Sequence, residues 1–117
     1  MVVLDFFASW CEACQASWPI IAAFAAEFPG VRVVALDQGE EPAALATFSS
    51  HQNVPIVLDP AGQVGQAYGV TGLPTIVGID AQGRIRNIWY GFSPQLGTFL
   101  RKAQARYGKS HQKIEGF

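Results

Sequence analysis

The sequence predicts an α/β fold in which a mixed central β-sheet is flanked by helices on both faces. Apolar, β-branched runs typical of buried strands alternate with stretches of helical spacing, and the last two such runs are separated by a loop of hairpin length. The chain has 117 residues, 50% of them hydrophobic, which fits one globular domain. We expect that domain to occupy residues 1–107, and residues 108–117, which are polar and without periodicity, to form a disordered tail.

The first half of the chain predicts a strand–helix–strand unit. Residues 2–7 and 31–36 are apolar and rich in β-branched side chains, as buried strands are. Between them, residues 11–28 carry alanine, isoleucine, phenylalanine and tryptophan at helical spacing, and a proline–glycine pair follows as a helix stop. Such a unit places its two strands parallel in one sheet, joined by a right-handed crossover. A further helix is expected over residues 41–50, because a proline stands in its first turn.

The second half predicts short strands and a closing helix. Ser93 is followed by a proline, which is typical of a helix N-cap and of the first helical position. Four aromatic side chains are expected in the core or at helix–sheet contacts, and one of the four could instead face a substrate. They are Trp18, Trp89, Tyr90 and Phe99. In order, we expect a strand over 54–58, one or two helical turns over 63–68, a hairpin of strands 75–80 and 84–90, and a helix from Ser93 to about residue 107.

The formal net charge of −1 conceals an uneven distribution of charge. Residues 1–83 carry eight acids and one base, whereas residues 84–117 carry seven bases and one acid. The nearly neutral total argues against a general binder of nucleic acid or membrane surfaces, so we expect no nucleic-acid partner. Arg101, Lys102 and Arg106 share part of one exposed face of the last helix. We interpret them as a solvated face that suits the helix C-terminus, with docking of an acidic partner or anionic lipid as the alternative.

The two cysteines, Cys11 and Cys14, stand where the first strand turns into the first helix. Two cysteines exclude a disulfide framework and a four-cysteine zinc site, and neither histidine lies at a ligand spacing, so we expect no metal and no cofactor. A thiolate at Cys11 is stabilised by the helix N-terminus, and Cys14 lies one turn later, within reach for a disulfide. The arrangement predicts a redox pair in which Cys11 attacks a substrate disulfide and Cys14 resolves the mixed disulfide. Half of a zinc site and an inert structural disulfide are the alternatives.

Residues 5–14, DFFASWCEAC, resemble the active-site stretch of thioredoxin-fold proteins. Pro19 matches the proline that kinks their first active-site helix, residues 70–75 resemble their cis-proline loop, and Gly91 matches the glycine after their last strand. These landmarks occur in the order of that fold and cover residues 2–107. The resemblance implies a groove around Cys11 that binds an extended substrate mainly through its backbone. The residues expected to line it are Trp10, Gly72, Leu73, Pro74 in the cis form, Gly91 and Phe92.

Within that fold, residues 54–70 are similar to the insert of the TlpA/ResA-like thiol–disulfide oxidoreductases, and CEAC is similar to the CEPC of ResA-type members. The resemblance implies a bacterial enzyme that reduces disulfides in protein substrates, in several relatives those of apocytochrome c, and that needs an upstream electron donor. It also implies an extracytoplasmic protein, periplasmic or membrane-anchored, with the cytoplasm left open. We expect a monomer. Because a strand begins at residue 2, we expect an N-terminus truncated from a longer precursor, with any anchor outside these residues.

Two carboxylates near the cysteines are expected to tune their chemistry. Asp5 matches the buried acid of thioredoxin and is expected to point at the back of the pair as a proton relay for Cys14, whereas an ordinary solvent-facing aspartate is the alternative. Ser17 stands where ResA-type proteins often keep a buried glutamate, so we expect the proton acceptor to have moved from the helix to the strand. Glu12 opposes thiolate formation at Cys11, which predicts a reductant.

Two other functions stay open beside a disulfide reductase. A disulfide oxidase or isomerase would use the same cysteines, and a redox-inert binding module would keep the fold without turnover. A thiol peroxidase of this fold needs a threonine three residues before its reactive cysteine, and Ala8 occupies that position. A reductase is therefore the function that the sequence favours.

Overall fold

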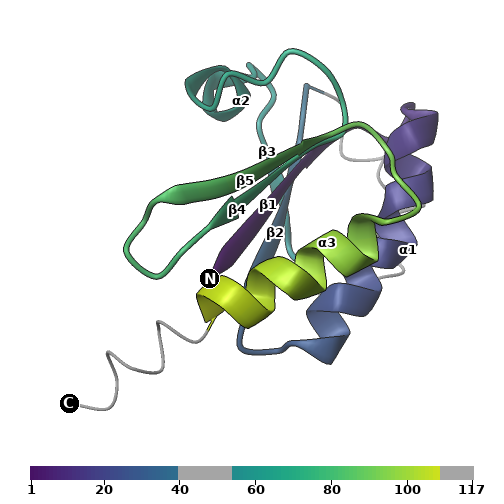
Figure 1. Ribbon diagram of the computed structural model, residues 1–117. Helices are drawn as coiled ribbons and strands as arrows, with labels where there is room; N and C mark the ends of the chain where they lie inside the picture. The colour runs from purple at the N-terminus through teal and green to yellow at the C-terminus, as the bar shows by residue number, and fades with distance from the viewer. Residues whose placement is uncertain (40–53, 109–117) are drawn as a thin grey trace.

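The computed structural model describes residues 1–39 and 54–108, which form a mixed five-stranded sheet and the helices packed against it (Figure 1). The predicted α/β fold is confirmed. The expected helix over residues 41–50 and residues 109–117 of the expected tail lie outside the described residues. The strands are β1 (Val2–Phe7), β2 (Arg32–Asp37), β3 (Ile56–Leu58), β4 (Thr75–Ile79) and β5 (Ile85–Tyr90); the helices are α1 (Glu12–Glu27), α2 (Gln63–Ala67) and α3 (Leu96–Ala103), followed by the π-helical turn η2 (Gln104–Gly108).

β1 lies at the centre of the sheet, whose strand order is β3-β2-β1-β4-β5. It pairs in parallel with β2, as the crossover through α1 requires, and antiparallel with β4. β4 and β5 form the predicted hairpin, and β3 pairs in parallel with β2. In this register Asp5 lies between Ala35 and Ile76, and the alternation of a strand puts all three on the same face of the sheet.

That face of the sheet is covered by α1 and α3, which lie side by side on it in Figure 1. Phe7 of β1 packs on Trp18 of α1 with ring centroids 5.6 Å apart, and Leu96 and Leu100 anchor α3 in the same cluster. Burial of each of these large apolar side chains contributes about 1.5–3 kcal/mol. The layer under α1 is therefore the main core, and it includes both cysteines.

The opposite face has a smaller apolar cluster of Phe6, Leu36 and Val77, against which Tyr68 packs at the end of α2. Asp59 holds the start of α2: its carboxylate accepts hydrogen bonds from the backbone N–H groups of Val64 and Gly65 at 3.2 and 3.0 Å. The bond from Gly65 above all lowers the pKa of Asp59. Together with α1 and α3, this segment gives the predicted helical cover on both faces (Figure 1).

Asp80 closes the hairpin between β4 and β5. Its Oδ1 accepts hydrogen bonds from the backbone N–H groups of Gln82 and Arg84, each 2.9 Å long, and its Oδ2 accepts one from Nε of Arg86 at 2.6 Å. The bond from Arg84 first, and then the guanidinium of Arg86, hold the pKa of Asp80 below its ordinary value. The hairpin is thus fixed at the end of the sheet where β1 begins.

The last helix is shorter than predicted. Ser93 is not its N-cap: the Ser93 carbonyl accepts a hydrogen bond from the N–H of Leu96 at 3.0 Å, and its hydroxyl accepts one from the N–H of Gln95 at 3.2 Å. Residues 93–95 consequently form a turn, and α3 begins at Leu96. After Ala103 the chain continues into the π-helical turn η2 instead of an α-helix. Among the described helices, none combines the length and apolarity needed to cross a membrane.

Two of the four aromatic side chains expected in the core, at helix–sheet contacts or, for one of them, at a substrate are exposed. Trp18 is 3% exposed and Trp89 is half-buried, as expected, but Tyr90 is 70% and Phe99 38% exposed. Tyr90 lies on the edge strand β5, on the side that points to solvent, and Phe99 lies at the border of α3. Their exposure leaves both rings available for contacts with other molecules.

Candidate functional site

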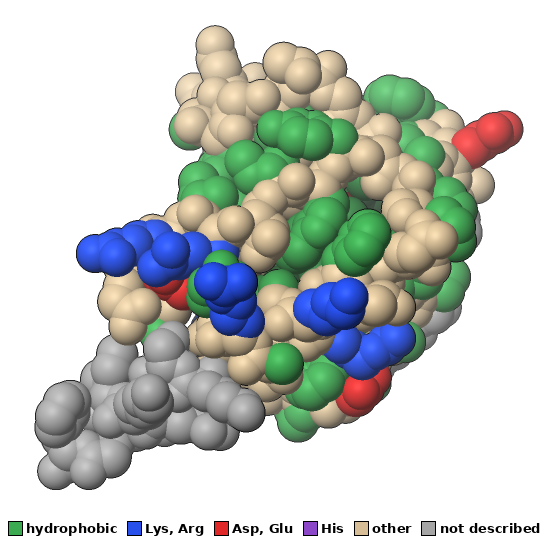
Figure 2. All heavy atoms as spheres, viewed as in Figure 1, with side chains coloured by type: hydrophobic (Ala, Val, Ile, Leu, Met, Phe, Trp, Pro, Cys, Tyr) green, Lys and Arg blue, Asp and Glu red, His purple; other side chains and the backbone are tan. Residues whose placement is uncertain are grey.

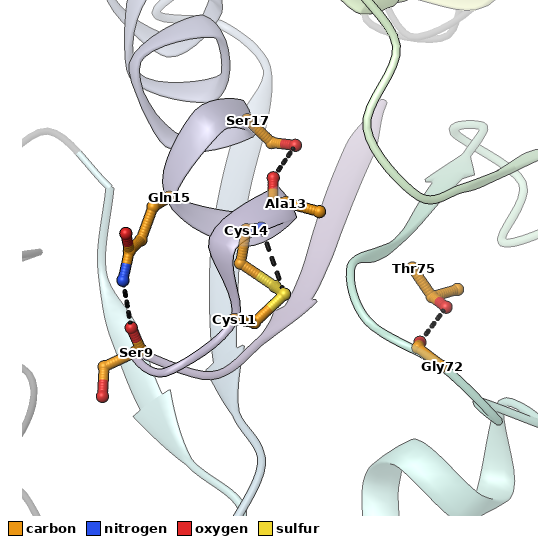
Figure 3. The surroundings of a disulfide bond; sticks show 8 residues. All are labelled: Ser9, Cys11, Ala13, Cys14, Gln15, Ser17, Gly72 and Thr75. Carbon is orange, nitrogen blue, oxygen red and sulfur yellow. Dashed lines mark hydrogen bonds between the residues drawn. A yellow bond between two sulfur atoms is a disulfide. The ribbon is translucent and has the colours of Figure 1, made fainter.

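Cys11 and Cys14 form a disulfide at the point where β1 leads into α1 (Figure 3). Cys11 is the N-cap of α1, and its Sγ accepts a hydrogen bond from the N–H of Cys14, with the two atoms 3.1 Å apart. A turn held by a bond of 3.2 Å from the N–H of Cys11 to the carbonyl of Ala8 brings the chain from the strand to this position. A sulfur in the N-cap position faces unpaired backbone N–H groups and the positive end of the helix, which favour its thiolate.

The two cysteine residues differ in their exposure to solvent. Cys11 is 8% exposed and Cys14 is 2% exposed, although their Cα atoms are only 5.1 Å apart. Reaction with a large substrate is easier at the more accessible sulfur, and the more buried sulfur is protected until the first has reacted. This asymmetry is what the predicted roles of the two cysteines require.

Two side chains brace the turn of the disulfide from the helix side (Figure 3). Gln15 donates a hydrogen bond from Nε2 to the carbonyl of Ser9 at 2.7 Å, across the loop that leads into α1. Ser17, fully buried, donates one from its hydroxyl to the carbonyl of Ala13 at 2.8 Å. The sequence analysis did not single out Gln15. Its amide, four residues after the first cysteine, was the only indication in the sequence that this side chain could bond to the loop. Ser17 adds no charge behind the pair.

The loop that precedes β4 faces the disulfide from the side away from Gln15 (Figure 3). Its Leu73–Pro74 peptide bond is cis, as the resemblance of this loop implies. The hydroxyl of Thr75 donates to the carbonyl of Gly72 at 2.7 Å, which closes the loop on itself. Gly91 donates from its N–H to the carbonyl of Pro74 at 2.8 Å and has a φ of 73°, so the end of β5 is bound to the cis-proline loop.

Exposed aromatic rings lie close in sequence to these elements. Trp10, immediately before Cys11, is 70% exposed, and Phe92, immediately after Gly91, is 44% exposed. Tyr90 is opposite Thr75 in the strand register, so it stands beside the cis-proline loop as well. The sequence favours burial of Tyr90 and leaves open that one of the four aromatic side chains faces a substrate; only the place of β5 at the edge of the sheet reveals that Tyr90 is exposed.

Asp5 is buried in the layer beneath α1. It is 1% exposed, and neither of its carboxylate oxygens has a hydrogen-bond partner in the described part of the chain. Its strand neighbours Ala35 and Ile76 belong to the same apolar cluster as Cys14. Because burial disfavours the charged carboxylate, the pKa of Asp5 rises from its ordinary 3.8 to about 7. The solvent-facing alternative for Asp5 is therefore wrong.

Glu12 occupies a different environment from Asp5. It is the first residue of α1 and is exposed to solvent. A carboxylate there is favourable for the helix N-terminus but lies next to Cys11 in the chain. Within residues 1–39 and 54–108, no group of three or more histidine, cysteine, aspartate or glutamate side chains is arranged to hold a metal ion.

The chain is similar to several proteins whose names describe thiol–disulfide chemistry. The model of the AhpC/TSA family matches residues 1–88. The thiol–disulfide oxidoreductase ResA of Bacillus subtilis is 37% identical over 94 residues, which cover 77% of this chain and 52% of ResA. The thiol:disulfide interchange protein DsbE homologue of Paracoccus denitrificans is 36% identical over 85 residues, 71% of this chain and 46% of that protein. The chain thus spans about half the length of these relatives.

The fold is shared with solved structures over most of its length. A secreted Mycobacterium tuberculosis disulfide oxidoreductase homologous to E. coli DsbE superposes with a TM-score of 0.78 at 25% identity, covering 89% of this chain and 80% of that one. The predicted thioredoxin-like fold and the resemblance to ResA-like proteins are confirmed by these matches.

Proposed function

Because the chain belongs to the AhpC/TSA family, we propose that it is a thiol–disulfide oxidoreductase that reduces disulfide bonds in protein substrates. The observation that carries the proposal is the Cys11–Cys14 disulfide at the N-terminus of α1, with Cys11 the more accessible sulfur. A dithiol carries two electrons by itself, so the reaction needs only a substrate disulfide and a donor that reduces the pair again.

The reaction starts from the reduced pair. The Cys11 thiolate attacks one sulfur of the substrate disulfide, a mixed disulfide forms, and the other substrate sulfur leaves as a thiolate and takes a proton. Cys14 then loses its proton and attacks Sγ of Cys11, which releases the second substrate thiol. The products are a reduced substrate and the Cys11–Cys14 disulfide, the state seen in the structure.

Asp5 is the proton acceptor that we assign to the second step. Its pKa of about 7 lies below the ordinary value of about 8.5 for a cysteine thiol, so its carboxylate accepts a proton near neutral pH and returns it readily. Asp5 is buried on the face of the sheet that α1 covers, and Cys14 lies in the apolar cluster on that face, which supports this role. Ser17, the residue behind the pair on the helix, has no ionisable group that competes with it.

The substrate groove that we propose lies between the disulfide and the cis-proline loop. The loop of Gly72, Leu73 and Pro74 faces the disulfide, and its backbone offers an edge to an extended substrate. Other residues that we place at this groove are Trp10, Gly91 and Phe92, and, from its exposure and its register with Thr75, also Tyr90. Recognition of this type depends on the substrate backbone and tolerates many sequences.

Glu12 sets the proposed direction of electron flow. Its negative charge next to Cys11 disfavours the thiolate, and strong disulfide oxidants are those whose reduced form is stabilised by a very stable thiolate. The pair should therefore act as a reductant. We further propose an extracytoplasmic location, which the secreted relative supports, and a monomeric protein. An oxidised CxxCH peptide of apocytochrome c is the first natural type of substrate to test, since the resemblance to ResA-like proteins suggests it.

Insulin reduction with dithiothreitol as the donor tests the proposed function. Cys11→Ser should reduce turnover to the uncatalysed rate, and Cys14→Ser should accumulate a mixed disulfide with the substrate that intact-mass analysis detects. Ser17→Ala, a substitution of another small buried side chain on the same helix, is the matched control and should retain activity within about threefold, since it loses one hydrogen bond. Wild-type turnover no faster than that of Cys11→Ser would assign the chain to the redox-inert alternative.

A further inference from the structure

We propose that the groove between β5 and α3 is a docking site for an acidic, extended peptide segment of a partner protein. The groove has a volume of about 230 Å³ and is lined by Asn87 and Trp89 of β5, by Phe99, Lys102 and Ala103 of α3, and by Arg106 and Tyr107 of η2. None of these residues belongs to the site around Cys11. The inference is independent of whether the disulfide turns over.

Charge on this face is positive and concentrated at the groove. Figure 2 shows lysine and arginine side chains gathered over α3 and the β4–β5 hairpin, beside hydrophobic side chains. Two of these arginines already have a carboxylate nearby: Arg86 binds Asp80, and Arg101 lies 3.9 Å from Glu27. Across residues 1–39 and 54–108, the groove cations Lys102 and Arg106 have no such ion pair. Lys102 and Arg106 therefore bring uncompensated positive charge to the groove.

The groove combines aromatic and apolar side chains with polar and charged ones. Phe99 is 38% exposed although it belongs to a helix whose other large apolar residues are buried, and the half-buried ring of Trp89 lies on the strand opposite. Tyr107 closes one end, with the guanidinium of Arg106 5.5 Å from its ring centre. Cations beside aromatic side chains, one of which, Phe99, is exposed, suit a ligand that has both a carboxylate and an apolar side chain.

The two groove cations come from consecutive helical segments. Lys102 belongs to α3 and Arg106 to the π-helical turn η2, and both line the same groove. Alternate residues of an extended strand are separated by about 6.6 Å and point to the same side. Acidic residues at positions i and i+2 of a bound strand can therefore both face the groove cations, while the residue between them contacts other groups.

Asn87 offers a hydrogen-bond acceptor to the backbone of a bound peptide. Its Oδ1 is buried and receives no hydrogen bond from any described residue. The amide turns easily about its last side-chain torsion, and it lines the groove, so a backbone N–H of a bound strand can satisfy this acceptor. The hollow shape of the site suits a single segment of chain that enters it more than the flat surface of a membrane.

Binding of a labelled peptide tests the proposal. The probe is a fluorescein-labelled, cysteine-free peptide of alternating glutamate and leucine, compared with the same peptide carrying glutamine in place of glutamate, on the full chain. By fluorescence anisotropy the acidic peptide should bind at least about tenfold more tightly, since both of its ion pairs are lost in the amide form. Because the peptide has no thiol or disulfide, its binding is separate from the proposed redox reaction. Absence of a preference for the acidic peptide would overturn the inference.

Variants locate the binding on the molecule. The double substitution Lys102→Gln/Arg106→Gln should weaken binding of the acidic peptide at least about tenfold, whereas Arg32→Gln/Arg84→Gln, with the same change in net charge outside the groove, should weaken it less than about twofold. Equal losses in the two double variants would mean attraction by overall charge and would contradict a specific site. Phe99→Ser removes the apolar contact at unchanged charge and should weaken binding as well.

Two measurements separate the groove from other binding modes. In a proton–nitrogen correlation spectrum, the acidic peptide should shift the indole signal of Trp89 and leave that of Trp10 unchanged; the reverse result places the peptide at the disulfide and refutes the inference. Vesicles of phosphatidylglycerol and phosphatidylcholine serve as the lipid probe. If Lys102 and Arg106 are needed for sedimentation with these vesicles while the peptide does not bind, the face is a membrane contact and the peptide site is wrong.

Discussion

Replacement of Asp5 by asparagine should make the stability of the oxidised protein much less dependent on pH. The pKa of Asp5 is raised to about 7 in the folded protein by burial, whereas an aspartate in the unfolded chain titrates at about 3.8. The folded state therefore binds a proton that the unfolded state has lost between these two values. Wild-type stability must fall as pH rises from about 4 to about 7 and must then level off.

The size of the effect follows from the two pKa values. The difference between them corresponds to a total change of about 4 kcal/mol in the free energy of unfolding. About 2.5 kcal/mol of this change occurs between pH 5 and pH 8, and nearly all of that occurs below pH 7. An asparagine side chain cannot ionise, so the stability of Asp5→Asn relative to wild type should rise by about 2.5 kcal/mol over this range. The unsatisfied amide adds a constant cost, which cancels when two pH values are compared.

Urea unfolding without reductant at pH 5, 6, 7 and 8 measures this difference. Asp80→Asn is the matched control, because Asp80 is also buried but has a lowered pKa. The stabilisation from a lowered pKa is complete above the unfolded value and is lost only in stronger acid, so this control should be less stable by a constant amount from pH 5 to 8. A flat profile for the stability of Asp5→Asn relative to wild type would show that Asp5 does not titrate near neutrality, and the assigned proton acceptor would then have to be abandoned.

Three further substitutions test other parts of the account. Gly91→Ala should destabilise the protein by about 1–2 kcal/mol in urea unfolding, because φ of Gly91 is 73° and alanine disfavours that region. Gly30→Ala is the control and should be neutral or slightly stabilising. Neither added Cβ has a neighbour within 4 Å, so equal effects of the two substitutions would refute a backbone cause. Gln15→Ala removes the brace across the loop before the disulfide and should cost about 0.5–1 kcal/mol in the same assay, and an unchanged midpoint would show that the bond is not needed. Glu12→Gln should raise the reduction potential of the cysteine pair, measured by equilibration with glutathione, so that the pair becomes a stronger oxidant. Glu27→Gln at the far end of α1 should leave the potential unchanged. A shift of the Glu12→Gln potential toward a stronger reductant would contradict the role given to Glu12.

The residues near the chain start could be assigned from sequence because local and tertiary preferences agree there. β1 and α1 lie within one or two residues of the expected ranges, since a β-branched run and a helical spacing each permit one regular structure. The position of Cys11 at the junction then follows directly. Burial of Asp5 was expected from its apolar neighbours, but only the pairing of β1 with β2 and β4 shows what flanks it.

The predictions from sequence were wrong where one local pattern is compatible with two different structures. Ser93 before a proline can cap a helix or close a turn, and here the hydroxyl bonds the N–H of Gln95, so the turn forms and α3 starts at Leu96. Tyr90 is an aromatic residue in a strand, which is buried in a central strand and exposed in an edge strand such as β5. The basic residues of α3 could be placed on one face, but the groove beside them depends on how α3 meets β5.

The reduction potential of the Cys11–Cys14 pair tests the central claim most directly. A reductase that acts on protein disulfides should have a midpoint potential near those of thioredoxin and the glutaredoxins, between about −300 and −200 mV. The value is obtained from equilibration with glutathione or dithiothreitol buffers, followed by alkylation of the free thiols and mass analysis. A potential close to that of the strong oxidant DsbA, about −120 mV, would contradict the proposal and make the chain a disulfide donor.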